Sequence, residues 1–227
     1  MEKHIALKKA QRRYAKSIID GLDPSELAGK SAGIVCSIFN SREFKTAENI
    51  FAYSAIRGEP ELYALFSAAV ALGRHVFLPV CEETGEMFFC DVTAAIEGSN
   101  ESCLNRGFPV PDMSSPEYVA EFTGKFRSRE LFSGKGFNSG AYGTREPDAS
   151  VFPRAENIPE RSVLLCPGLA FDSGGNRLGR GKGFFDKYLS EHRSHFESVC
   201  GVCFSELVLP SVAVLPHDAK MDQIFMS

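Results

Sequence analysis

Several features of other protein classes are missing from this sequence of 227 residues. No run approaches the ~18 consecutive apolar residues of a membrane-spanning helix, and residues 1–9 lack the apolar core of a secretory signal. Basic residues are not in excess, because 25 Lys and Arg stand against 29 Asp and Glu and the net charge is −4. A sequence-independent nucleic-acid binder needs a broad basic surface. We therefore expect a cytoplasmic protein that binds neither a membrane nor nucleic acid.

The cysteines show no disulfide framework. Their number, seven, is odd, their spacing is irregular, and Cys36, Cys90 and Cys166 lie in apolar runs, as expected of buried thiols in a reducing compartment. Cys200 and Cys203 form a C-x-x-C within a predicted strand, where residues three apart point to opposite faces. We interpret them as buried thiols, with a metal or redox pair as the alternative.

Hydrophobic patterning predicts alternating helices and strands in a chain whose 44% hydrophobic and 24% charged residues are typical of a folded domain. Asp23 is the expected capping residue of the second helix. The expected helices span 3–20, 28–39, 60–72 and 181–192, and the expected strands span 49–56, 75–80, 87–92, 162–166 and 198–204. This alternation predicts one α/β domain over 1–227, with three layers: a mostly parallel central sheet and helices on both faces.

Residues 94–157 differ from the rest of the chain. They contain turn-forming clusters of Gly, Ser, Asn and Pro and few periodic apolar residues beyond a weak helix near 116–129. We predict irregular chain over the domain surface, with an insertion at about 113–140. An irregular segment of that length is uncommon inside a compact domain, so a functional or locally disordered segment is expected.

The densest chemical signal is a glycine-rich segment, RLGRGKGFFD, that begins at Arg177 and leads from a predicted strand into a helix. Glycines at 179, 181 and 183 allow backbone N–H groups to approach an anion, and the helix N-terminus adds a favourable dipole. Arg177, Arg180 and Lys182 supply positive charge for phosphate or carboxylate. Open α/β sheets bind ligands at this end of their strands. Together these features predict a phosphate site.

Two common phosphate-binding patterns do not match this segment. A Walker A motif needs Gly at 176 and Ser or Thr at 183, where the chain has Asn176 and Gly183. The dinucleotide pattern G-x-G-x-x-G needs Gly at 184, where the chain has Phe184. A flexible turn with solvated basic residues is therefore the alternative to a phosphate site.

The same segment, preceded by PGLAFD and GN, resembles the 5-formyltetrahydrofolate cyclo-ligase (5,10-methenyltetrahydrofolate synthetase) family. Further landmarks of that family occur in the expected order, from about Lys8 to Asp222, apart from 113–140. They are the Lys8 and Arg12 pair, Glu59-Pro-Glu-Leu followed by a helix and HVFLP, Gly143-Thr-Arg-Glu-Pro, and His217-Asp218 with Asp222 four residues later.

The chain also departs from the family pattern. Phe184 and Phe185 stand where the family usually has at least one Tyr, and Leu62 stands where it has Thr. Each change removes a hydroxyl that could form a hydrogen bond, and the aromatic pair keeps its stacking surface. Neither change removes a charged group.

The resemblance implies an ATP- and Mg²⁺-dependent enzyme that converts 5-formyltetrahydrofolate into 5,10-methenyltetrahydrofolate, ADP and phosphate through an iminium phosphate. Such phosphoryl transfer needs positioning and charge neutralisation more than a protein nucleophile. By the same resemblance, Lys182 and Arg180 act in catalysis, Glu59 and Phe184 bind the folate, and Asp186 and Asp218 bind Mg²⁺. The implied ATP-binding residues are Lys8, Arg12, Arg177, Leu178, Gly179, Arg180, Gly181, Lys182, Gly183, Phe184 and Phe185.

Two other functions are compatible with the residues. The departures at Leu62, Phe184 and Phe185 motivate a non-catalytic folate- or nucleotide-binding protein on the same fold. An enzyme acting on a sugar phosphate is a further alternative, because fold does not determine function. We expect a monomer.

Overall fold

The centre of the structure, a computed structural model that describes residues 2–126, 132, 136–140 and 143–227, is a six-stranded sheet. Neighbouring strands are parallel except β2 and β3, which form an antiparallel edge. In spatial order the strands are β11 (Gln223–Phe225), β9 (Ser198–Val202), β6 (Ser162–Pro167), β1 (Asn49–Phe51), β2 (His75–Cys81) and β3 (Met87–Asp91). The predicted mostly parallel sheet is confirmed.

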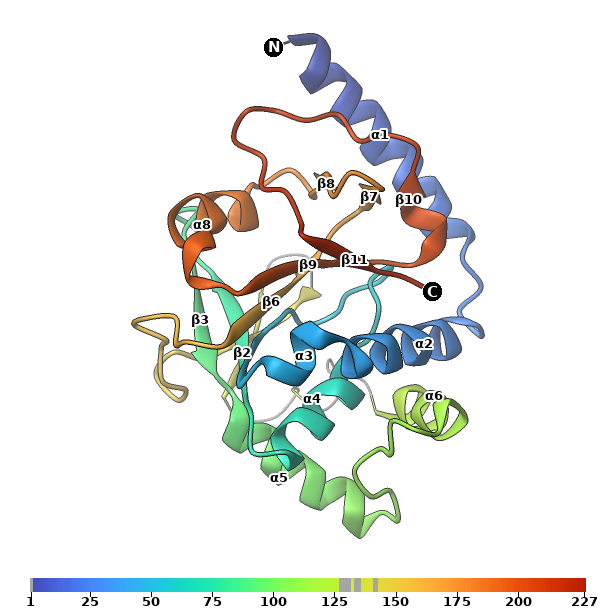
Figure 1. Cartoon of the computed structure of the whole chain (residues 1–227), viewed down its shortest axis with the longest axis vertical. Coiled ribbons are helices and arrows are strands. Elements are labelled where there is room, and N and C mark those ends of the chain that lie inside the picture. Colours follow the sequence, from blue (N-terminus) through green and yellow to red (C-terminus); the bar gives the residue numbers. More distant parts are fainter. Residues whose placement is uncertain (1, 127–131, 133–135, 141–142) are drawn as a thin grey trace.

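Helices cover both faces of this sheet (Figure 1). One face carries α2 (Leu27–Asn40), α3 (Arg42–Thr46) and α4 (Tyr63–Ala71), with α5 (Thr93–Asn105) and α6 (Pro116–Lys125) outside them. The other face carries α8 (Phe184–His192) and a small sheet, beyond which lies α1 (Glu2–Gly21). The small sheet contains β10 (Val208–Leu209), β7 (Ala170–Asp172) and β8 (Arg177–Leu178). The three predicted layers are present, and the small sheet forms part of the second outer layer.

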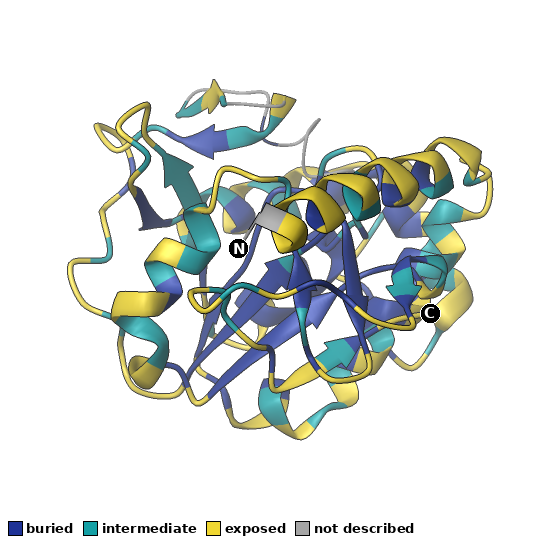
Figure 2. Ribbon diagram, turned by 90° about the horizontal axis from the view of Figure 1, so that it is seen from above, coloured by how far each residue is buried: buried dark blue, intermediate teal, exposed yellow. Residues whose placement is uncertain are grey.

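Side-chain alternation explains why the central strands are buried on both faces (Figure 2). Phe51 in β1 stacks on Phe77 with ring centroids 4.4 Å apart, and its edges meet Phe89 and Phe196. Its neighbour Ile50 points to the other face and is fully buried. The aromatic cluster joins β1, β2 and β3 and packs against Tyr188 of α8 on that face of the sheet.

Several predicted boundaries were wrong because the chain leaves the sheet or begins a helix at a different residue. The strand predicted over 49–56 ends at Phe51, because the next residues turn out of the sheet. The helix predicted over 60–72 begins only at Tyr63, after the Glu61 side chain has accepted hydrogen bonds from the N–H groups of Leu62 and Tyr63. Asp23 does not cap α2, since it accepts from Ser25 in a turn and α2 begins at Leu27.

The prediction of irregular chain over 94–157 was wrong in part, whereas the weak helix expected near 116–129 is present as α6 over Pro116–Lys125. Helix α5 occupies Thr93–Asn105, and α6 packs against α2 through its buried residues Val119, Phe122 and Thr123. The remainder of the helix expected to residue 129 lies outside the described residues. A two-stranded hairpin, β4 (Phe137–Ser139) and β5 (Arg145–Pro147), follows and packs on β2. The insertion at about 113–140 stays a prediction.

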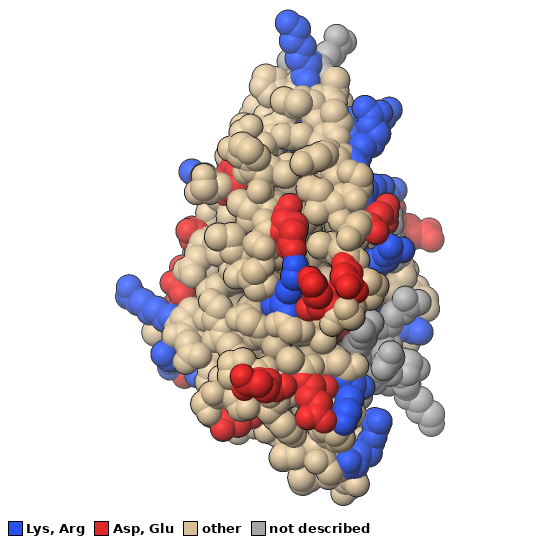
Figure 3. Space-filling model, turned by 90° about the vertical axis from the view of Figure 1, so that its right-hand side faces the viewer, with Lys and Arg blue, Asp and Glu red and all other residues tan. Residues whose placement is uncertain are grey.

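The surface carries mixed charge. On the face drawn in Figure 3, acidic and basic side chains are interspersed and form no continuous basic area. No helix in the described part of the chain is both long and apolar enough to cross a membrane. All seven cysteines are free, and burial raises the pKa of the Cys200 and Cys203 thiols to about 12, so both are protonated at neutral pH.

Candidate active site

The glycine loop connects β8 to α8. Gly181 and Gly183 have φ angles of +111° and +76°, which side chains rarely adopt, so glycine is required for this path. Helix α8 begins at Phe184, three residues later than predicted, and Asp186 therefore lies in its first turn. The N–H groups at this helix start have no partner within the helix and can donate to an anion.

This loop separates two adjoining pockets that share Gly179, Gly183 and Asp186. The first, of about 120 Å³, lies between the loop, the segment after β1 and the β2–β5 region. The second, of about 460 Å³, lies between the loop, α1 and the 215–218 turn. Charged side chains line both pockets; the first also contains the aromatic rings of Tyr53, Phe184 and Phe185, and glycine backbone forms part of the second. Two chemically different ligands could therefore meet at the loop.

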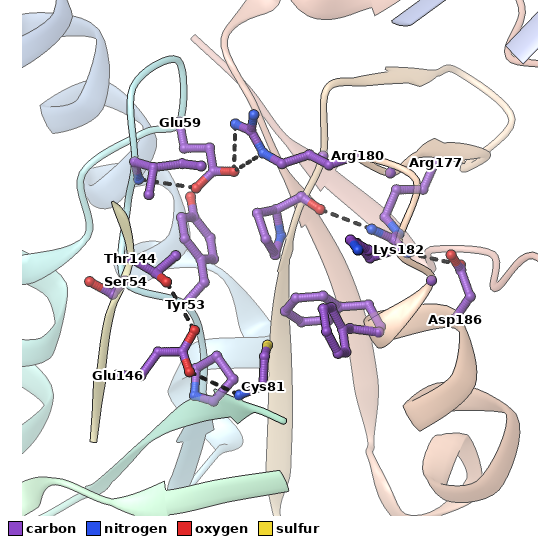
Figure 4. A pocket seen from close by; sticks show the side chains of 18 of the residues that line it. Tyr53, Ser54, Glu59, Cys81, Thr144, Glu146, Arg177, Arg180, Lys182 and Asp186 are labelled. Atoms are coloured by element: carbon purple, nitrogen blue, oxygen red, sulfur yellow. Dashed lines mark hydrogen bonds and ion pairs between the residues drawn. The ribbon is translucent and has the colours of Figure 1, made fainter. Parts of the chain in front are cut away.

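A buried ion pair lies at one side of the first pocket (Figure 4). Arg180 Nη2 and Nε lie 2.9 and 3.1 Å from Glu59 Oε1, and the Ile56 N–H donates to Glu59 Oε2 at 3.2 Å. Only 6% of the Glu59 side chain is exposed. Burial raises the pKa of Glu59, and the Arg180 guanidinium opposes this rise. The predicted folate carboxylate is thus tied to the glycine loop.

Lys182 faces the same pocket (Figure 4) and forms no hydrogen bond or ion pair with any described residue. Phe184 and Phe185 also line this pocket, and the Arg177 guanidinium lies 5.6 Å from the Phe185 ring centre. Of the loop cations that line the first pocket, Lys182 is therefore the one whose charge is not already neutralised by a carboxylate. Leu178 is fully buried, so only its backbone can contribute to a ligand site.

The second pocket contains a buried ion pair between the two ends of the chain. Lys8 Nζ lies 2.6 Å from Asp218 Oδ1, and their side chains are 7% and 8% exposed. Arg12, one helical turn after Lys8, donates from Nε to the Gly179 carbonyl at 2.8 Å. His217 lines the same pocket. Helix α1 thus brings both of its predicted ATP residues to the second pocket, where Arg12 contacts the glycine loop.

A second buried pair fixes the loop to α8. Arg177 Nη2 lies 2.8 Å from Asp186 Oδ1, with side-chain exposures of 4% and 16%. Arg177 also donates to the Pro167 carbonyl at 3.2 Å, and Asp186 accepts from the Ala219 N–H at 3.2 Å. The pair therefore joins β8, the end of β6, α8 and the C-terminal segment around one wall of the site.

Asp186 and Asp218 are suited to Mg²⁺, which prefers oxygen ligands and commonly uses one or two carboxylates together with phosphate oxygens and water. Both residues line the second pocket, beside the loop. The described residues contain no group of three or more metal-ligating side chains. The residues present thus fit a metal that a nucleotide helps to hold, and they do not form a closed protein cage.

Glu146 and its neighbours line part of the first pocket, but the sequence analysis did not predict them as site residues. Glu146 Oε2 accepts from the Cys81 N–H at 3.0 Å, and Oε1 accepts from the Thr144 hydroxyl at 2.9 Å. Tyr53 also lines this pocket and donates its hydroxyl to the Pro60 carbonyl. The Glu-Pro pair at 146–147, a landmark of the family pattern, is the sequence feature that could have indicated Glu146 as a site residue. Leu62, where the family has Thr, is fully buried and lines neither pocket.

Asp172 holds the turn that leads into the glycine loop. This buried carboxylate accepts four hydrogen bonds, from the N–H groups of Gly174, Asn176 and Val212 and from the Asn176 amide, at 2.8–3.1 Å. Burial opposes ionisation, but the hydrogen bonds together hold the pKa of Asp172 below its ordinary value. The charged form therefore stabilises the folded state.

We expect Asp172→Ala to lower the free energy of unfolding by about 2–3 kcal/mol at pH 7, because buried donors lose their acceptor. The pKa of Asp172 is lower in the folded state than in the unfolded state. The difference in free energy of unfolding between the wild type and the variant is therefore largest above the unfolded pKa of about 4, and it declines as the pH falls through the folded pKa. Urea unfolding at pH 7 and pH 3 measures this, with exposed Glu160→Ala as the control. An equal difference at both pH values would show that the charge is not what stabilises the turn.

Comparison with known proteins identifies one family. The sequence pattern of the 5-formyltetrahydrofolate cyclo-ligase family matches residues 6–227. The chain is 30% identical over 179 residues to a 5-formyltetrahydrofolate cyclo-ligase of Mycolicibacterium smegmatis, covering 79% of this chain and 73% of the relative.

Two solved structures have the same fold. The NMR structure of Aquifex aeolicus 5,10-methenyltetrahydrofolate synthetase aligns with a TM-score of 0.66 and 22% identity, covering 97% of this chain and 89% of that one. A 5,10-methenyltetrahydrofolate synthetase from Mycoplasma pneumoniae aligns with a TM-score of 0.58 and 15% identity, covering 96% and 97%.

Proposed function

Since the chain belongs to the 5-formyltetrahydrofolate cyclo-ligase family, we propose that it converts 5-formyltetrahydrofolate into 5,10-methenyltetrahydrofolate at the expense of ATP. The observation that carries this proposal is the glycine loop with a different pocket on each side. The first pocket, with its aromatic rings, suits a flat heteroaromatic ring. The charged second pocket suits a nucleotide whose phosphates lie against the loop. We also expect the protein to act in the cytoplasm as a monomer.

In this arrangement the formyl oxygen of the folate reaches the γ-phosphate of ATP at the loop, where the two pockets adjoin. Transfer of the phosphoryl group gives an iminium phosphate, and N10 then attacks the former formyl carbon as phosphate leaves. Lys182 is free to lie against the transferring group and neutralise its charge. Arg180 links the loop to Glu59 and so aligns the folate pocket with the phosphate site.

The remaining site residues position rather than react. Arg12 holds the loop through the Gly179 carbonyl, and Lys8 exchanges its contact with Asp218 for a phosphate oxygen when the nucleotide enters. Asp186 and Asp218 would hold Mg²⁺, which supplies charge neutralisation of the phosphates when it is bound. Arg177 pairs with Asp186 and so holds this carboxylate beside the second pocket.

The direct test supplies purified protein with 5-formyltetrahydrofolate and Mg-ATP and follows the methenyl absorbance together with released phosphate. We expect both products in equal amounts, and neither when ATP is omitted or Mg²⁺ is chelated. Folded protein that forms no methenyl product would overturn the proposal. Tight binding of 5-formyltetrahydrofolate without turnover would instead identify a non-catalytic binding protein, and phosphate-dependent binding of a sugar would identify a sugar-phosphate enzyme.

A further inference from the structure

Glu146 differs from the other buried carboxylates around the two pockets. Glu59, Asp186 and Asp218 are each paired with a cation, whereas no ion pair among the described residues includes Glu146. Glu146 is only 8% exposed. Removing a carboxylate from water without a counter-charge is unfavourable unless its hydrogen bonds compensate. Among the described residues, Glu146 is thus a buried pocket carboxylate that has hydrogen-bond donors but no cationic partner.

The described residues use only part of the hydrogen-bonding capacity of Glu146. An ionised carboxylate has about four lone-pair positions. The described residues supply two donors, the Cys81 N–H and the Thr144 hydroxyl, one to each oxygen. These contacts hold the carboxylate from β2 at one oxygen and from the start of β5 at the other. Glu146 lines the first pocket, so a ligand there can offer further donors to this carboxylate.

The Glu146 and Glu59 carboxylates lie at opposite sides of the first pocket. In Figure 4 the two carboxylates lie on either side of Tyr53, with Glu59 beside Arg180 and Glu146 beside Cys81. Pro79 and Phe184 also line the pocket and offer flat apolar surfaces to a ring. A ring in this pocket can therefore present one edge toward the glycine loop and a different edge toward Glu146.

We propose that Glu146 determines specificity for the pterin ring by accepting hydrogen bonds from the ring N–H and the adjacent amino group of its pyrimidine edge. This inference rests on the proposed function. Two parallel donors on a flat ring match two carboxylate oxygens, and hydrogen bonds to a charged group are the stronger kind. A pocket built around such a pair discriminates sharply against a ligand that lacks one donor, because its buried acceptor is then left unpaired.

The first measurement uses the wild-type protein and two substrates, 5-formyltetrahydrofolate and its 2-desamino analogue, with Mg-ATP in excess. Loss of one donor to the carboxylate is expected to lower kcat/KM by about 10- to 100-fold, mostly through KM. Equal kcat/KM for the two compounds would overturn the proposal without any variant being made.

The second measurement repeats the comparison with Glu146→Gln, which keeps the shape of the side chain and removes its charge. Glu156→Gln, at an exposed residue that forms no ion pair with any described residue, is the matched control. We expect Glu146→Gln to turn over the natural substrate with a KM raised about 10- to 100-fold, an unchanged KM for ATP, and little remaining preference over the analogue. If Glu146→Gln still prefers 5-formyltetrahydrofolate over the analogue as strongly as the wild type does, the proposal is overturned. That result would show that Glu146 has only a structural role, because loss of a structural residue does not change the preference between the two compounds.

Failure of this inference is distinguishable from failure of the proposed function. Equilibrium binding of the same two compounds to the wild type and to Glu146→Gln needs no turnover. If the protein binds 5-formyltetrahydrofolate and its 2-desamino analogue equally but forms methenyl product, only the proposed role of Glu146 is wrong. Protein that prefers 5-formyltetrahydrofolate through Glu146 but forms no product contradicts only the proposed reaction.

Discussion

Lys182→Ala is expected to lower kcat by about 10³-fold while leaving the folded state intact, because a cation that stabilises a transferring phosphoryl group is typically responsible for an effect of this size. Lys182 is exposed and lines the first pocket, and its removal breaks no hydrogen bond or ion pair with any described residue. The KM for 5-formyltetrahydrofolate is expected to change little, since Lys182 acts mainly on the charge that develops during transfer.

Steady-state kinetics with Mg-ATP, together with a thermal unfolding curve, measure both parts of this prediction. Lys45→Ala is the matched control, because Lys45 is an exposed lysine that precedes β1, at the opposite end of that strand from the pocket. Near-normal turnover of Lys182→Ala would remove Lys182 from its proposed role. A lowered melting temperature with normal activity per folded molecule would assign it a structural role instead.

The central strands were predictable because burial on both faces leaves continuous apolar runs. The strands expected at 75–80 and 162–166 each extend one residue further than predicted. Helix α5 was not predictable, since its sequence, TAAIEGSNESCLN, contains Ser, Asn and Gly, which disfavour helix interiors. Its formation depends on tertiary contacts instead, among them two hydrogen bonds between Asn100 and Ser67 of α4.

The candidate site was predictable to the extent that its chemistry is local in sequence. The glycine loop carries its own cations and precedes its own helix, so residues 177–186 indicated an anion site directly. The ion pairs around the loop were not predictable, because their partners are far apart in the sequence. Lys8 and Asp218 are separated by 210 residues, and Arg180 and Glu59 by 121 residues. Glu146 was missed for the same reason, since its N–H donor, Cys81, belongs to a strand 65 residues earlier.

Arg177→Met is expected to lower the free energy of unfolding by about 3–5 kcal/mol, because it leaves the buried Asp186 carboxylate without its counter-charge. Methionine fills most of the volume of the arginine stem, so little of the loss comes from a cavity. The Ala219 N–H remains as a hydrogen-bond donor to Asp186 but carries no full charge. The effect should exceed that of any exposed ion pair, such as Arg57 with Asp20, which contributes at most about 1 kcal/mol.

A four-member cycle separates the charge effect from the other contacts of Arg177. Urea unfolding of the wild type, Arg177→Met, Asp186→Asn and the double variant gives the coupling free energy of the pair. We expect the double variant to be more stable than Arg177→Met alone, because neutralising Asp186 removes the unpaired buried charge. Additive losses would show that the pair contributes little and that the Pro167 contact dominates. The measurement is made without nucleotide or Mg²⁺, so the proposed role of Asp186 in metal binding does not enter the result.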